Sequence, residues 1–282
     1  MRARKVTGWV VVALLTLQTA CGGLLAGVRL ALRDQSSAQA GFNLFSPEQD
    51  VELGQASAEE ISRQVVVLRD ARTEAYVQRL GERLAAEAPG YKFPYKFVVV
   101  ASPEVNAFAL PGGYVFVNEG AIEAARSEGE LAGVLAHEIA HVSLRHGTTQ
   151  ASRAYLARTG LGIVGALGVA LRGDVGRLAS LLGGAEAEKV FAESNREAEA
   201  RADAEGARLM AAAGYDPRKM AEFFERLYER GDRREQESAG DHPDPASRVA
   251  AIAAVAAGLK PVDARAHDSE EFCRVRSRLS SR

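Results

Sequence analysis

The chain has 282 residues, of which 47% are hydrophobic and 26% are charged, and its formal net charge is −2. These values fit a globular protein and exclude a disordered chain, a disulfide-stapled miniprotein and a membrane protein with many spans. Because the sequence has no long basic block and few aromatic residues, we also expect no nucleic-acid partner.

Residues 1–20 have the three-part layout of an export signal, in which basic, apolar and small residues follow one another. Cys21 comes next, at the position of the lipidated first residue of bacterial lipoproteins, and Gly22 after it favours the outer membrane. We therefore expect residues 21–41 to tether the protein to the lipid bilayer on the periplasmic side of the cell envelope. Two alternatives stay open. Residues 9–28 carry no charge and are long enough for an uncleaved membrane anchor, or the signal is removed and the protein is secreted.

The folded domain is predicted over residues 42–260, as an α+β architecture that is mainly helical. Ser46 and Gln49 form a capping box, which predicts a helix that runs toward residue 68. Apolar residues at helical spacing predict a second helix that ends before Pro89.

The pattern changes after these two helices. β-branched and aromatic residues at 95–101 and 114–117 predict a small sheet with an exposed edge, and most of the chain beyond it is predicted to be helical. Residues 160–184 carry eight glycines among apolar residues and fit either close-packed helices or a mobile cover. Residues 261–282 are predicted to be a charged C-terminal tail.

One of the later helices carries a chemically informative motif. Residues 137–141 are His-Glu-Ile-Ala-His, an HExxH sequence. The helix around it is predicted to begin at a capping box of Ser127 and Glu130 and to end at His146 and Gly147. The helical setting matters because it fixes the directions in which the motif's side chains point.

Four residues of α-helix turn about 400°, so His137 and His141 project from one face and both reach one Zn²⁺. Glu138 lies beside the metal rather than on it. There it takes a proton from the attacking water and later delivers it to the leaving amine. The sequence thus predicts two zinc ligands and one catalytic acid–base residue.

Two histidines leave a catalytic zinc one protein ligand short. His146 is predicted about 140° further round the helix than the second histidine, facing away from the metal and beside the carbonyl ends. The third ligand is therefore sought in a later helix, capped by Ser194 and Glu197. Glu199 and Asp203 share one face of it, so when one carboxylate coordinates the metal the other lies within reach. The residues alone leave the choice among these acids open.

Four motifs stand in order along the chain: NAFALPGG (106–113), HEIAH (137–141), SNREAEARAD (194–203) and HPDPASR (242–248). Over residues 42–259 the chain resembles the HtpX-like and CAAX-prenyl-protease-like gluzincin metallopeptidases, and within them the periplasmic lipoprotein type that includes the beta-barrel assembly-enhancing protease. The resemblance implies a zincin-like fold and a zinc endopeptidase with one Zn²⁺ per chain.

The resemblance assigns Glu199 as the third zinc ligand and Asp203 as the partner that orients a ligand histidine. It also places His242 near the zinc as a further catalytic residue, with two roles open: steadying the oxyanion, or occluding the metal in a latent state. Without the resemblance, a histidine in front of a proline would be a solvated loop residue.

The resemblance further implies that residues 114–117 form an edge strand that lines the active-site cleft. An extended polypeptide would pair its backbone with the unpaired groups of such a strand, and the turn before it would shape the strand. The implied substrate-binding residues are Asn106, Gly113, Tyr114, Val115 and Phe116.

The predicted function is that of a lipid-anchored zinc endopeptidase of the bacterial envelope, which cleaves extended polypeptides such as misfolded or misassembled envelope proteins. The alternative is a non-proteolytic chaperone or assembly factor that uses the same groove. Glu138 argues against the alternative, because a scaffold needs no acid beside the metal. A structural protein with a chance HExxH sequence would bind no zinc.

Overall fold

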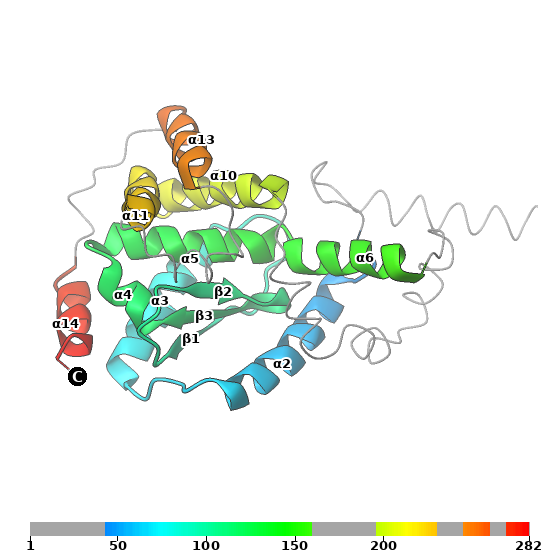
Figure 1. The fold of residues 1–282 in the computed structure, drawn as a ribbon, viewed down its shortest axis with the longest axis horizontal. Helices are drawn as coiled ribbons and strands as arrows, with labels where there is room; N and C mark the ends of the chain where they lie inside the picture. Colours follow the sequence, from blue (N-terminus) through cyan, green and yellow to red (C-terminus); the bar gives the residue numbers. More distant parts are fainter. Residues whose placement is uncertain (1–42, 160–195, 230–244, 260–268, 282) are drawn as a thin grey trace, which may run out of the picture. The chain divides into compact units, whose positions relative to one another are not determined.

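The computed structural model describes residues 43–159, 196–229, 245–259 and 269–281, which are the coloured parts of Figure 1. The predicted export signal, Cys21 with its tether, the glycine-rich stretch, the Ser194 cap and the His242 loop lie outside these residues. Within the described ranges, no helix combines the length and the apolar character needed to cross a bilayer.

The first two helices begin as the sequence predicts. In α2 (Pro47–Gln64), the Ser46 hydroxyl accepts the Gln49 N–H, and the Gln49 side chain accepts the Ser46 N–H at 2.8 Å. This capping box satisfies two backbone donors that a helix start would otherwise leave without partners. In α3 (Ala71–Ala86), the Asp70 carboxylate accepts the first N–H groups.

The sheet has three strands: β1 (Lys96–Val100), β2 (Ala107–Ala109) and β3 (Tyr114–Asn118). Their order is β1-β3-β2, with β1 parallel and β2 antiparallel to β3. The prediction that residues 114–117 form the edge strand is therefore wrong, because β3 is the central strand. The physical reason is β2, a three-residue strand inside the NAFALPGG motif that local sequence presents only as turn chemistry.

A 3₁₀ turn, η1 (Pro111–Gly113), connects β2 to β3 and packs against α2. Gly112 has φ 77°, in the left-handed region that residues with a side chain avoid. A Cβ at this position would also lie 2.5 Å from the Asp50 carbonyl oxygen. Glycine is thus required twice over, for the turn and for the close approach of α2.

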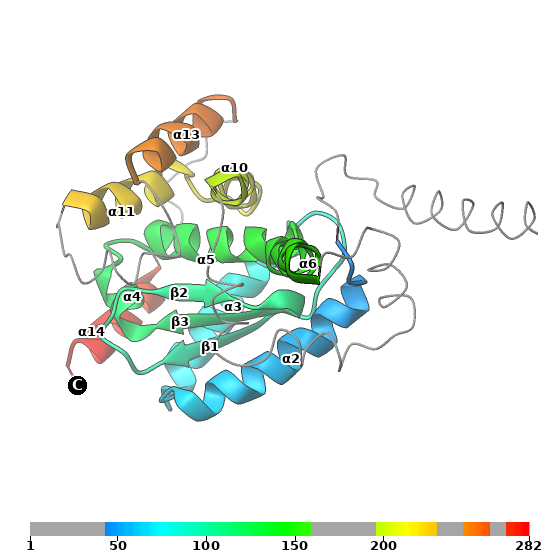
Figure 2. The same ribbon diagram turned by 45° about the vertical axis from the view of Figure 1, so that its right-hand side comes forward.

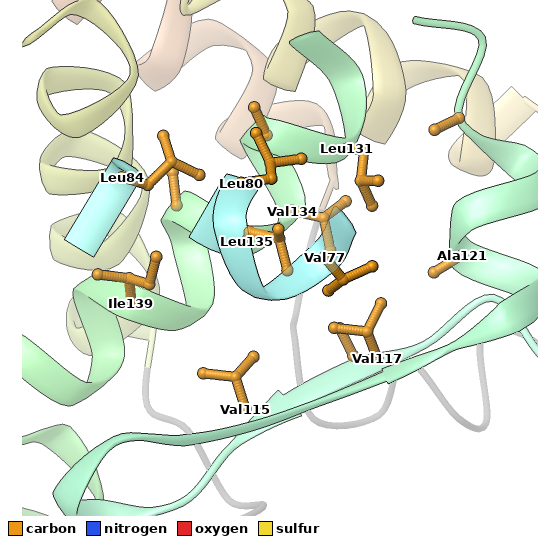
Figure 3. Close-up of a cluster of buried hydrophobic side chains, with 14 of the residues drawn as sticks. Val77, Leu80, Leu84, Val115, Val117, Ala121, Leu131, Val134, Leu135 and Ile139 are labelled. Carbon is orange, nitrogen blue, oxygen red and sulfur yellow. The ribbon is translucent and has the colours of Figure 1, made fainter. Parts of the chain in front are cut away.

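The main core lies between the sheet, α3 and α5 (Glu128–Ser143), as Figure 3 shows. A smaller cluster on the other face of the sheet packs under α2 and contains Phe116, which is completely buried. The sheet is thus covered on both faces. The core side chains labelled in Figure 3 are Val77, Leu80 and Leu84 of α3, Val115 and Val117 of β3, Leu131, Val134, Leu135 and Ile139 of α5, and Ala121 of the short helix α4 (Glu119–Ala124).

A second helical layer covers the side of α5 that faces away from the sheet (Figures 1 and 2). It consists of α10 (Arg196–Ala212), α11 (Arg218–Glu229) and α13 (Pro245–Ala257), and both α10 and α11 contact α5. At Gly206 of α10, an added Cβ would lie 3.2 Å from the His137 backbone nitrogen. This glycine lets α10 approach the middle of α5 closely, which brings the acidic residues of α10 to the HExxH motif.

The helix that carries the HExxH motif ends three residues earlier than predicted. α5 stops at Ser143, and Arg145 has φ 57°, a left-handed conformation that ends helices but is uncommon outside glycine. A new helix, α6 (His146–Thr159), then begins. At the start of α5 the Ser127 hydroxyl accepts the Glu130 N–H as expected, but the Glu130 carboxylate accepts the N–H of residue 126 instead of closing the box.

The expected charged tail contains a folded helix, α14 (Glu270–Leu279), which corrects that prediction. Its charged residues occupy the exposed face, while Phe272, Val275 and Leu279 are buried against the core. Their i, i+3, i+7 spacing is the pattern of an amphipathic helix, which the high overall charge of the segment conceals. Ser269 caps the helix by accepting the Phe272 N–H at 3.1 Å.

Candidate metal centre

Three predicted ligands converge between α5 and α10. The His137 and His141 Nε2 atoms lie 3.0 Å apart, as their i, i+4 spacing dictates. The Glu199 carboxylate lies across from them, with Oε2 3.3 Å from His137 Nε2 and Oε1 3.2 Å from His141 Nε2. All three side chains are buried or nearly so. Among the described residues, these three form the cluster whose donor atoms could hold a metal ion.

The spacing of these atoms fits a tetrahedral Zn²⁺. For metal–ligand bonds of about 2.0–2.1 Å, two corners of a tetrahedron lie about 3.3 Å apart. The two imidazole nitrogens lie 3.0 Å apart, and each has one Glu199 oxygen at a similar distance, Oε2 at 3.3 Å from His137 and Oε1 at 3.2 Å from His141. Two imidazoles and one carboxylate are also the ligand types that zinc takes in catalytic sites, with the fourth corner left to water or substrate. The residues present therefore fit the ion that the motif implies.

Of the acids that the sequence left open, Glu199 is the one that faces both histidines. Glu199 is 98% buried and faces both histidines, whereas Glu197 is exposed at the start of α10. Glu197 thus lies where a carboxylate interacts favourably with the positive end of the helix dipole. Its place two residues earlier puts it on another face of α10.

Asp203 lies on the side of His137 that faces away from Glu199. Its Oδ1 lies 2.9 Å from His137 Nδ1, the ring nitrogen opposite the one that faces Glu199. The Arg248 guanidinium of α13 donates to both Asp203 oxygens, at 2.8 and 2.9 Å. Burial alone would raise the pKa of Asp203, but the hydrogen bonds from His137 and Arg248 lower it to about 2. Asp203 therefore stays ionised and fixes the His137 ring.

The pKa values of the two histidines depend on their burial and on the charged groups packed around them. Burial and the Arg248 cation lower the pKa of His137, but its hydrogen bonds to Asp203 and Glu199 raise it to about 9. Burial lowers the pKa of His141, against the raising effects of the Glu199 and Glu138 carboxylates. The Glu138 residue is buried, and its carboxylate lies near enough to His141 to raise the pKa of that ring.

His146 contradicts its prediction. Instead of facing away, it is buried with its Nδ1 3.1 Å from His141 Nδ1. The angle expected from continuing α5 does not apply, because the helix ends at Ser143 and Arg145 turns the chain back. Burial, together with the nearby His141, lowers the pKa of His146 to about 2, so its ring is neutral.

The residues expected to bind substrate through an edge strand have other places. Val115 and Phe116 are completely buried in the two cores, and β3 pairs with strands on both sides. The Tyr114 hydroxyl accepts a hydrogen bond from Lys96 at 3.1 Å on the exposed surface. Asn106 stands just before β2, where its carbonyl accepts the N–H of residue 118, and Gly113 lies in the turn η1.

Comparison with known families agrees with this centre. The model of peptidase family M48 matches residues 71–256, which include both histidines, Glu138 and the acids of α10. The chain belongs to peptidase family M48. Membership accounts for the helical domain with a small mixed sheet and for the two-histidine, one-glutamate cluster at its centre.

Three curated relatives show how far the similarity extends. The putative beta-barrel assembly-enhancing protease of Vibrio cholerae is 33% identical over 186 residues, or 64% of this chain and 38% of the relative. The beta-barrel assembly-enhancing protease of Escherichia coli K12 is 28% identical over 235 residues, or 82% of this chain and 48% of the relative. The mitochondrial metalloendopeptidase OMA1 of Schizosaccharomyces pombe is 33% identical over 157 residues, or 55% and 44%. The chain thus spans about half the length of these relatives, or less.

Proposed function

We propose that this protein is a zinc-dependent endopeptidase whose metal is held by His137, His141 and Glu199. The observation that carries the proposal is the convergence of two imidazole nitrogens, 3.0 Å apart, on the two oxygens of one buried carboxylate at 3.2 and 3.3 Å, beside a buried glutamate, in a chain of a peptidase family. Zinc is inferred from the donor set and its spacing together with the family.

Each residue of the centre has a separate task in peptide hydrolysis. Zinc bound there would lower the pKa of a water molecule and polarise the peptide carbonyl. Glu138 accepts the proton of the attacking water on its carboxylate and then donates it to the leaving amine nitrogen. Asp203, held by Arg248, keeps the His137 ring in the orientation and tautomer that ligation requires.

The substrate groove is better assigned to β2 than to β3. β2 is at one end of the strand order and contacts α5, the helix that carries the zinc ligands. The outer edge of β1 is partly covered by residues 66–68, which form backbone hydrogen bonds with residues 99 and 101. An extended polypeptide would add to the outer edge of β2 and cross the metal centre. Asn106, immediately before that strand, would then lie beside the substrate.

The setting proposed for this activity is the periplasmic side of the bacterial envelope, with Cys21 as the lipid anchor and misfolded or misassembled envelope proteins as substrates. It is supported by the signal-like N-terminus and by relatives whose names describe proteases that enhance beta-barrel assembly. His242, as a residue that steadies the oxyanion or blocks the metal, stays a prediction within this proposal.

The proposal is tested by cleavage of an unfolded protein such as reduced casein. We expect Glu138→Gln to bind zinc like the wild type and to lose about 10²–10⁴-fold in cleavage rate, the usual contribution of a general acid–base residue. Zinc content and the cleavage rate are measured on the same preparations. Equal cleavage by the two proteins would overturn the proposed role of Glu138 and favour a non-proteolytic scaffold.

A further inference from the structure

The two zinc ligands of α5 have different outer partners. His137 presents its Nδ1 to the Asp203 carboxylate at 2.9 Å, whereas His141 presents its Nδ1 to the His146 ring at 3.1 Å. An imidazole that ligates a metal through one nitrogen carries its proton on the other, and the partner of that proton fixes the plane of the ring.

The contact between His141 and His146 allows one arrangement of protons. Since His141 faces Glu199 and His137 with Nε2, its proton belongs on Nδ1. The neighbouring nitrogen, His146 Nδ1, must then offer a lone pair, and His146 carries its own proton on Nε2. Among the described residues, His146 Nε2 is buried without a hydrogen-bond partner. Burial of the His146 ring thus leaves its Nε2 without a partner among the described residues, while its Nδ1 faces the proposed zinc ligand His141.

A separate set of contacts holds His146 in this position. Arg145, in its left-handed conformation, forms an ion pair with Asp50 at 2.7 Å and donates to the Phe45 carbonyl at 2.5 Å. The Leu44 N–H donates to Ser152 of α6 at 2.9 Å. The segment in front of α2, together with the first turn of α2, therefore holds the turn between α5 and α6, and with it the start of α6 where His146 stands.

We propose that His146 is a positioning residue of the metal centre: its Nδ1 accepts the Nδ1–H of His141 and fixes that ring for zinc ligation. The inference rests on the proposed zinc function. It gives each histidine ligand its own acceptor, a carboxylate for His137 and a neutral imidazole for His141.

The test replaces His146 with Asn or Gln, whose side-chain amides differ in length. The side-chain oxygen of Asn takes the place of a histidine Nδ1, whereas that of Gln takes the place of Nε2. We expect His146→Asn to keep the zinc dissociation constant close to that of the wild type. His146→Gln and His146→Leu should weaken zinc binding about 10–100-fold, the usual effect of removing an outer partner. Dissociation constants are measured by competition with a chelator of known affinity.

Tyr215→Phe is the control, because Tyr215 is buried and its hydroxyl donates to Glu128 at 2.7 Å, at the end of α5 far from the zinc ligands and from the contacts that hold His146. It should lower the unfolding temperature and leave zinc affinity unchanged. Should His146→Leu fail to fold, the contrast between the Asn and Gln variants still decides. Equal zinc affinity in all three His146 variants, whether unchanged or equally weakened, would overturn the positioning role alone. A wild type that binds no zinc would overturn the proposed function and this inference with it.

Discussion

The two ends of α5 both bury carboxylates, yet only one of them has the character of a metal centre. At the N-terminal end, Glu128 accepts hydrogen bonds from Tyr215 at 2.7 Å, from Tyr76 at 3.2 Å and from Ser269. Two residues on, Glu130 forms an ion pair with Arg226, whose two terminal nitrogens each donate to one carboxylate oxygen. Every one of these contacts joins a donor to an acceptor.

At the other end, two imidazoles and a carboxylate, all of them groups that can ligate a metal, face one another. The Nε2 atoms of His137 and His141 lie 3.0 Å apart and face the Glu199 carboxylate, which has no proton to give when ionised. A metal ion bound between them would take the place of the proton that otherwise joins His137 to Glu199. Both ends bury charged groups, and what distinguishes the C-terminal end is that two imidazoles and one carboxylate each offer a ligand atom within 4.8 Å of the others.

The largest loss of stability is expected from a substitution at Glu128. Glu128→Gln puts an amide N–H₂ where a hydroxyl donor already points, so we expect the free energy of unfolding to fall by about 3 kcal/mol. Zinc affinity should stay within about threefold of the wild type, since nine residues of helix, about 13 Å, separate position 128 from the first ligand. Urea denaturation and zinc titration check the two parts. A large loss of zinc affinity would show that the two ends of α5 are coupled.

Asp203→Asn probes the metal centre without changing a proposed zinc ligand. We expect about 10–100-fold weaker zinc binding, because the amide faces His137 and Arg248 without the charge that holds both. Asp216→Asn is the matched control. Asp216 also forms an ion pair with an arginine, Arg218, but this pair lies at the start of α11. Identical zinc affinities for the two variants would contradict the role given to Asp203.

The smallest effect is expected at the surface pair that links α14 to α3. Arg79 lies 2.5 Å from Glu271, but their side chains are 54% and 45% exposed. Arg79→Ala should lower the free energy of unfolding by about 0.5 kcal/mol or less, because solvent and salt screen such pairs. Thermal unfolding measures the change. A loss as large as that of Glu128→Gln would mean that surface charge, rather than the buried carboxylate, holds α14 in place.

Much of the metal centre could be predicted from sequence because its geometry is local. The i, i+4 spacing of His137 and His141 in a capped helix determines where both rings point. The third ligand needed more, because the approach of α10 to α5 is a tertiary contact, and the residues alone left several acids open. The family resemblance selected Glu199, and the geometry agrees with it.

The errors have a common physical cause, which is that pairing and termination depend on distant residues. Strand order followed from β2, which is too short to show a strand period within its three residues. His146 was misplaced because Arg145 adopts a conformation that its residue type disfavours and that Asp50 helps to hold. The fold of α14 was hidden because its buried side chains are few among many charges.

The central claim is tested most directly by the zinc content of the wild type beside Glu199→Gln, after equilibration at a defined free zinc concentration. The substitution keeps the shape of the side chain and removes the negative charge that faces the two imidazoles. We predict one zinc per chain for the wild type and close to none for the variant, with the unfolding free energies of the two metal-free proteins nearly equal. A variant that retains one zinc per chain at unchanged affinity would contradict the account.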